Sequence, residues 1–186
     1  WFVASTDSYL KWIAHLAMES PPNWVVRLIL LKSTQNPSLR QAEGALVATE
    51  PSENDWERLD IRNLLRQVKE RNPDRLVLGV TGPSLELIRH FLDSDARSRN
   101  IPIISGSPGV ALDQPVQWIT RKAKADVVIC SSRAEREQLQ NIYSRLDRKP
   151  WVALSTLPFL DSDKQVRSSE VKKVIFVPQP DVPGTS

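Results

Sequence analysis

The feature that most constrains the fold of this 186-residue chain is a repeated alternation of short apolar runs with segments of helical periodicity. The first unit sets the pattern, because the apolar run 2–4 is followed by apolar residues at the spacing of one helix face, from Leu10 to Ala17. Parallel strands need a long crossover, usually a helix, between them. The alternation therefore predicts a Rossmann-like, doubly wound α/β domain with a mostly parallel sheet and helices on both faces.

Each strand and helix has its own local signal. We expect strands at 2–4, 25–31, 56–59, 76–80, 101–104, 127–130, 151–154 and 174–177. We expect helices to begin near Asp7 or Ser8, Ser38, Asp60, Gly82, Asp113 and Ser132. The helix after Asp113 is expected to bury Val116, Ile119 and Ala123.

The length of the chain indicates one domain, because 186 residues can bury one core but not two large ones. We expect this domain to span residues 1–177, with the proline-containing segment 178–186 as a linker toward a further domain. No apolar run approaches the roughly 20 residues that cross a bilayer. The single cysteine, Cys130, agrees with a reducing compartment, and we expect a cytoplasmic protein.

Ligands of open parallel sheets bind beyond the carboxyl ends of the strands, where loops and helix N-termini meet. Four strand-end loops at 5–9, 81–84, 105–109 and 131–133 carry small or hydroxylated residues. The candidate binding residues in and beside them are Ser8, Tyr9, Lys11, Gly82, Pro83, Ser105, Gly106, Pro108 and Gly109. The alternative is structural, since Gly and Pro also turn a chain, and Tyr9 and Lys11 suit packing or the surface.

Asp7 is the candidate catalytic residue. Its carboxylate stands in the first strand-end loop, where it could accept a proton from a hydroxyl nucleophile. The alternative is that Asp7 only caps the following helix.

Other polar residues give weaker signals. His15 and His90 lack carboxylate or cysteine partners at metal-ligand spacing, so we predict no metal site and place both on the surface. Cys130 ends a buried strand and is expected to pack as a small apolar residue. The net charge is +3, and the basic groups at 121–124 and 145–149 are expected to be solvated helix faces. They would also suit an anionic ligand or peripheral contact with a membrane, and nothing predicts a nucleic-acid partner.

Four segments together resemble a known family. They are DSYLKW at 7–12, TGPS at 81–84, IISGSPG at 103–109 and FVPQP at 176–180. They resemble a bacterial family of proposed GT-B-type glycosyltransferases, and the chain is similar to the N-terminal half of that architecture, in which two Rossmann-like domains face each other across a cleft.

The resemblance implies a division of labour. A small-molecule or glycan acceptor would bind to this half, and a nucleotide-sugar donor would bind mainly to a C-terminal domain outside this chain. Asp7 would be the acceptor-activating base, the loops at Gly82 and 106–109 would line the cleft, and this half would need no cofactor and would be inactive alone. A non-catalytic domain that binds a nucleotide, sugar or phosphate remains the alternative. A dehydrogenase-type domain is disfavoured, because no glycine fingerprint follows the first strand.

Overall fold

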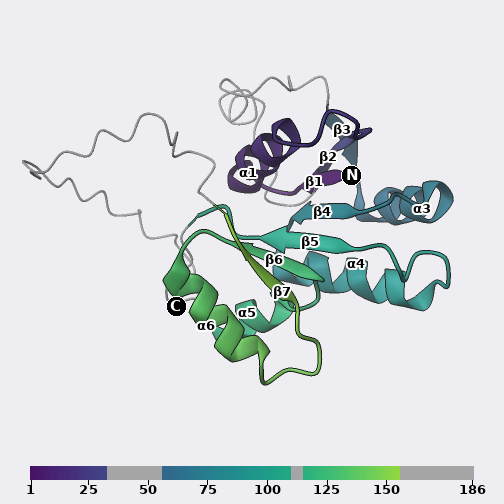
Figure 1. The fold of residues 1–186 in the computed structure, drawn as a ribbon. Coiled ribbons are helices and arrows are strands. Elements are labelled where there is room, and N and C mark those ends of the chain that lie inside the picture. The colour runs from purple at the N-terminus through teal and green to yellow at the C-terminus, as the bar shows by residue number, and fades with distance from the viewer. Residues whose placement is uncertain (33–55, 110–114, 156–186) are drawn as a thin grey trace, which may run out of the picture.

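Seven parallel strands form one sheet in the computed structural model, which describes residues 1–32, 56–109 and 115–155 (Figure 1). The strands are β1 (Phe2–Ala4), β2 (Leu28–Leu31), β3 (Trp56–Leu59), β4 (Leu76–Gly79), β5 (Ile103–Gly106), β6 (Val127–Cys130) and β7 (Trp151–Leu154). The described helices are α1 (Asp7–Met18), α3 (Ile61–Arg71), α4 (Gly82–Ser94), α5 (Val116–Lys122) and α6 (Arg133–Tyr143).

The strand order is β3-β2-β1-β4-β5-β6-β7. The chain builds outward from β1 to β3, returns to place β4 beside β1, and then builds outward in the other direction to β7. The order therefore reverses between β1 and β4, and this reversal is the switch point at which doubly wound folds bind ligands. The predicted doubly wound parallel sheet is confirmed.

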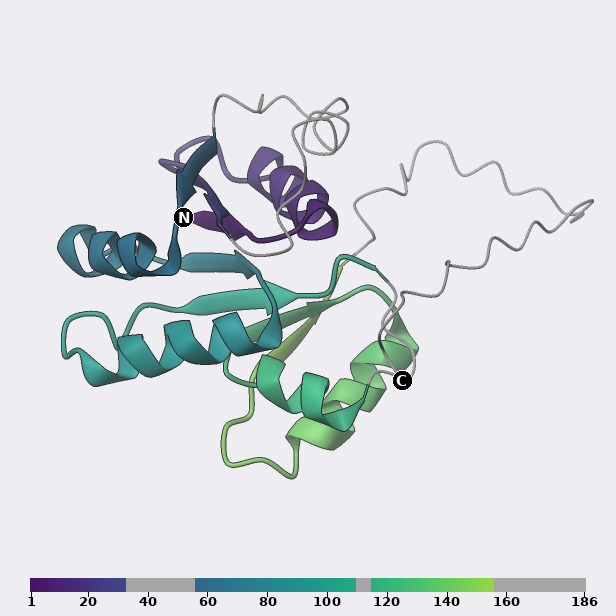
Figure 2. The same cartoon turned by 180° about the vertical axis from the view of Figure 1, so that it is seen from behind.

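Helices cover both faces of the sheet, as predicted. On one face α1 packs Leu10 and Ile13 against Phe2 and Ala4. On the other face α3, α4, α5 and α6 pack against Val3 and its neighbours. Successive residues of a strand point to opposite faces, so Phe2 and Val3 contribute to different cores. Figure 2 shows α4, α5 and α6 together on the side of the sheet away from α1.

Side chains that bond to the first turn begin three of these helices. Asp60 Oδ1 accepts from the main-chain N–H of Asn63 at 2.8 Å and caps α3, as predicted. Ser132 Oγ accepts from Glu135 N at 3.1 Å and caps α6, as predicted. The cap of α1 is Thr6, whose Oγ1 lies 3.5 Å from Tyr9 N.

The prediction that Asp7 or Ser8 caps α1 is therefore wrong. Thr6 has the extended backbone of a cap, with φ −139° and ψ 169°, whereas Asp7 is already the first helical residue. The hydroxyl of Thr6, one residue before Asp7, accepts from the main-chain N–H of Tyr9.

Two strands start later than predicted. β2 begins at Leu28, because Leu28 is the residue that pairs with Phe2 of β1, and Val25 precedes the ladder with 97% of its surface exposed. β5 covers Ile103–Gly106 and not 101–104, because its ladder starts where Ile103 pairs with Leu76.

The prediction that Val116 is buried is wrong, because 60% of its surface is exposed at the start of α5. Ile119 and Lys122 occupy the buried face of the helix in its place. The helix predicted near Ser38, the start predicted near Asp113, the strand predicted at 174–177 and the linker at 178–186 lie outside the described residues.

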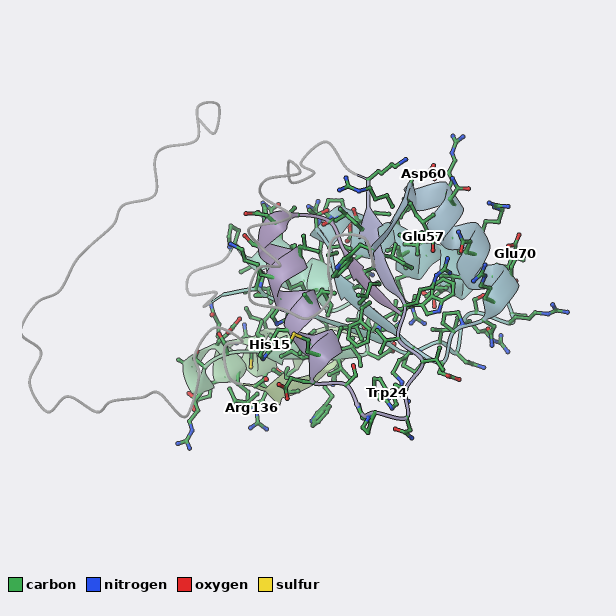
Figure 3. The ribbon with its side chains drawn as sticks, turned by 90° about the horizontal axis from the view of Figure 1, so that it is seen from above. His15, Trp24, Glu57, Asp60, Glu70 and Arg136 are labelled. Carbon is green, nitrogen blue, oxygen red and sulfur yellow. The ribbon has the colours of Figure 1, made fainter. Side chains whose placement is uncertain are left out.

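The two ends of the strand order are opposite ends of the molecule. In Figure 3, Glu57, Asp60 and Glu70 lie at the end formed by β3 and α3, and Arg136 of α6 lies at the other. Among the described helices, none combines the length and the apolar character that a bilayer crossing requires.

Candidate functional site

The loops that follow β1, β4, β5 and β6 lie next to one another at the carboxyl edge of the sheet, because these four strands are consecutive in the strand order. The four loops predicted from the sequence therefore lie in one row along this edge. The β1 and β4 loops flank the switch point itself, where Ser5 N donates to Gly79 O at 3.0 Å.

Asp7 is the first acidic residue after β1, which is one of the two strands that flank the switch point. It is half-buried in the first turn of α1, one residue after the Thr6 cap. Within the described part of the chain its carboxylate makes no hydrogen bond and no ion pair. Asp7 thus combines partial burial with unused acceptor oxygens.

The other candidates on α1 differ in exposure. Ser8 is exposed and Lys11 is half-buried. Tyr9 packs edge-on against Trp12, with ring centroids 6.4 Å apart, and burial raises the pKa of its hydroxyl. A Cβ added to Gly79 would lie 2.6 Å from Ile13 Cγ1, so the glycine lets α1 approach β4 closely. This contact fixes α1, and with it Asp7, over the switch point.

Gly82 and Pro83 form the first turn of α4, and Pro83 is exposed. The Thr81 and Ser84 hydroxyls lie 3.1 Å apart. A Cβ on Gly82 would lie 2.9 Å from Cδ of Arg121, so the Arg121 side chain of α5 lies directly across this glycine. Glycine at position 82 therefore allows close packing between α4 and α5.

The predicted 105–109 loop divides into two parts. Ser105 and Gly106 are inside β5 and buried, and Ser105 Oγ donates to Leu78 O at 2.8 Å. A Cβ on Gly106 would lie 2.7 Å from both Ile129 O and Trp12 Cζ2. Pro108 and Gly109 follow the strand and are half-buried, and no atom lies within 4 Å of a Cβ added to Gly109.

Lys122 at the end of α5 also lies near these loops, although the sequence did not single it out as a candidate residue. The prediction that Lys122 belongs to a solvated helix face is wrong. Only 7% of Lys122 is exposed. Its Nζ donates to Gly106 O at 3.1 Å and to Ser107 Oγ. Burial lowers the pKa of Lys122 from 10.5 to about 8, although the charge of Glu135 acts in the opposite direction. Its position three residues after Ile119 indicates the buried face of α5 but does not indicate its partners at the end of β5.

Glu135 is the second buried charge near these loops, with 2% of its surface exposed. Its Oε2 accepts from the N–H and the hydroxyl of Ser131, at 3.0 and 3.1 Å. The predicted capping pair with Ser132 is thus half formed, because the carboxylate bonds to Ser131 and not to the cap residue. Burial first, and the charge of Glu135 second, raise the pKa of Tyr143, whose buried hydroxyl has no partner among the described residues.

A cavity of about 350 Å³ lies at the opposite edge of the sheet. It is lined by residues that precede β1, β2 and β4, including Trp1, Trp24 and Arg75. The guanidinium of Arg75 stacks on the ring of Trp24 at 4.2 Å. This cavity is therefore separate from the candidate residues, all of which lie toward the carboxyl edge.

The described residues hold no group of three or more His, Cys, Asp and Glu side chains that could bind a metal ion. His15 on α1 lies apart from Glu57, Asp60 and Glu70 in Figure 3. His90 is exposed, and Cys130 is buried at the end of β6 as predicted, where its pKa is raised by burial.

A doubly wound parallel sheet, with a carboxylate and several loops at its switch-point edge, defines a Rossmann-like α/β domain. Residues 1–186 match the model of the family described as "Putative glycosyltransferase (DUF6716)", and the chain belongs to this family. Comparisons with curated proteins and with solved structures found no match to the chain.

Proposed function

We propose that this chain is the acceptor-side half of a glycosyltransferase with two facing Rossmann-like domains. A small-molecule or glycan acceptor binds at the carboxyl edge between the β1, β4 and β5 loops. A nucleotide-sugar donor binds mainly to a C-terminal domain outside this chain. The proposal is supported by the family to which the chain belongs and by the position of the candidate residues at the switch point.

The observation that carries the proposal is the state of Asp7. Its half-buried carboxylate has free acceptor oxygens within the described part of the chain, and Thr6, not Asp7, caps α1. A structural cap would use these oxygens on main-chain N–H groups. A general base needs them free to receive a proton from the acceptor.

The chemistry follows from this role. The acceptor hydroxyl oxygen attacks the anomeric carbon of the donor sugar, and Asp7 takes the hydroxyl proton. The bond from the anomeric carbon to the nucleoside diphosphate breaks, and the diphosphate leaves with the electron pair. The other domain brings the donor to the acceptor, and such placement contributes about 7 kcal/mol or more in well-oriented systems.

The direct test is sugar transfer by the full-length protein carrying Asp7→Asn, compared with wild type and with the isolated chain. Loss of transfer in the variant supports the proposal. Unchanged turnover in the variant removes Asp7 from it, and transfer by the isolated chain removes the division into halves. Binding of a sugar or nucleotide by a full-length protein that never transfers would favour a non-catalytic binding domain.

A further inference from the structure

One side of the short helix α5 bears three side chains with different environments. Arg121 lies across Gly82 at the start of α4, and its Nε lies 3.4 Å from Glu86 Oε2. Lys122 reaches Gly106 and Ser107 at the end of β5. These contacts fix the rotation of α5 about its axis, so they also fix the direction of the third residue, Trp118.

Residues of an α-helix turn by about 100° per position, so Trp118 points in a direction between those of Arg121 and Lys122. Trp118 also lies one turn closer to the N-terminus of α5. That end of the helix lies toward the carboxyl edge of the sheet, because the chain enters α5 after leaving the carboxyl end of β5. Trp118 therefore faces the space between the start of α4, at Gly82, and residues 107–109, which follow β5.

Trp118 is 52% exposed in this position. An indole is a large apolar surface, and proteins ordinarily bury most of it. The matched comparison within the chain is Trp12 of α1, which is 2% exposed and packs against the position of Gly106. Trp118 thus leaves about half of its surface open beside two of the candidate loops.

We infer that Trp118 is a stacking residue for a pyranose ring of the acceptor. The C–H bonds on one face of a pyranose carry partial positive charge, and the face of an indole carries partial negative charge. Arg121 beside it has five N–H donors, of which the pair with Glu86 engages only part, so it can bond to ring hydroxyls. The inference depends on the proposed function for the identity of the ligand, and it adds a residue to the site.

The test is a titration of the full-length protein, labelled with ¹⁵N at tryptophan, while the indole N–H signals are recorded. The probes are the methyl pyranosides of glucose, galactose and mannose in one arm, and UDP and GDP in the other. The Trp118 signal is identified by its loss in Trp118→Phe. Trp151, which is 67% exposed at the start of the edge strand β7, is the matched control.

At least one pyranoside is expected to shift the Trp118 signal and leave that of Trp151 in place. Trp118→Ala is expected to weaken this binding about tenfold or more, and Trp118→Phe to weaken it less, because a ring is retained. Trp151→Ala is expected to leave it unchanged.

Three outcomes would overturn the inference. They are a Trp118 signal that responds to no pyranoside, a response of Trp118 to nucleotides alone, and equal pyranoside responses of Trp118 and Trp151. This experiment measures binding and not turnover, so its failure can be told apart from a failure of the catalytic test of Asp7. A specific response of Trp118, together with normal turnover of Asp7→Asn, would leave the stacking residue in place and remove only the catalytic role.

Discussion

The ε-ammonium of Lys122 donates a hydrogen bond to the main-chain carbonyl of Gly106, 3.1 Å away, and joins α5 to the carboxyl end of β5. The same group bonds to Ser107, the first residue after the strand. A buried cation is costly unless its donors are engaged. The two bonds engage the ammonium that burial removes from water, and they hold the end of β5 and Ser107 against α5.

The pH dependence of stability tests this arrangement through the variant Lys122→Met. Burial lowers the pKa of Lys122 from 10.5 to about 8, so between these values the unfolded chain binds a proton that the folded chain does not. The free energy of unfolding of wild type then rises with pH in this range. Relative to Lys122→Met, we expect a gain on the order of 2 kcal/mol between about pH 7.5 and about pH 9.5, measured by urea unfolding.

Lys122→Met is the necessary reference for the pH dependence of stability. Burial raises the pKa of Cys130, so the unfolded chain loses this thiol proton first and stability falls with pH over part of the same range. Both proteins contain Cys130, and the difference between them isolates Lys122. A difference that does not change with pH would show that Lys122 titrates alike in the folded and unfolded chains.

Gly106→Ala is expected to destabilise the domain by about 1–3 kcal/mol, as overpacking typically does. The added methyl group would lie 2.7 Å from Ile129 O and from Trp12 Cζ2, and neither a strand carbonyl nor a buried indole can move away easily. Gly109→Ala is the control, because the added group has no atom within 4 Å. Thermal unfolding of both variants is the measurement, and equal melting temperatures would contradict the close packing at Gly106.

Asp7→Asn in the full-length protein is expected to fold normally and to lose about a hundredfold or more in turnover, the typical effect of removing a general base. Asp60→Asn is the matched control, since Asp60 caps α3 after the edge strand β3, two strands away from β1, and Asn caps a helix about as well as Asp. Turnover is measured with saturating donor and acceptor. An equal loss in both variants would indicate a general effect on the fold and not on the reaction.

Asp126→Ala is expected to lower the free energy of unfolding by about 2 kcal/mol or more. Asp126 Oδ2 accepts from Ile103 N at 2.8 Å and from Arg89, which is only 7% exposed, and its Oδ1 accepts from Arg148. Glu70→Ala is the control, because its partner Arg66 is on the surface and such pairs contribute about 0–1 kcal/mol. Urea unfolding compares the two, and equal costs would show that Asp126 contributes no more than a surface charge.

The candidate site was predicted from the sequence only in outline. Loop positions follow from where strands end, so the segments at Asp7, Gly82 and Gly109 could be placed at one edge in advance. The division within 105–109 could not, because the ladder that pairs Ser105 with Leu78 decides which of these residues are inside the sheet. Trp118 and Lys122 carried no functional signal, since their directions depend on how α5 is rotated against α4 and β5.

The sequence by itself determined the alternation of strands and helices, the parallel sheet and the helix caps Asp60 and Ser132, because apolar periodicity and capping act over a few neighbouring residues. The tertiary structure alone decided that Val25 lies outside the β2 ladder and that the ammonium of Lys122 is bonded to Gly106. These outcomes depend on strand register and helix packing between residues far apart in the chain, as in the bond from Lys122 to Gly106. Long-range contacts of this kind leave no periodic pattern in the local sequence, and only the folded chain brings their partners together.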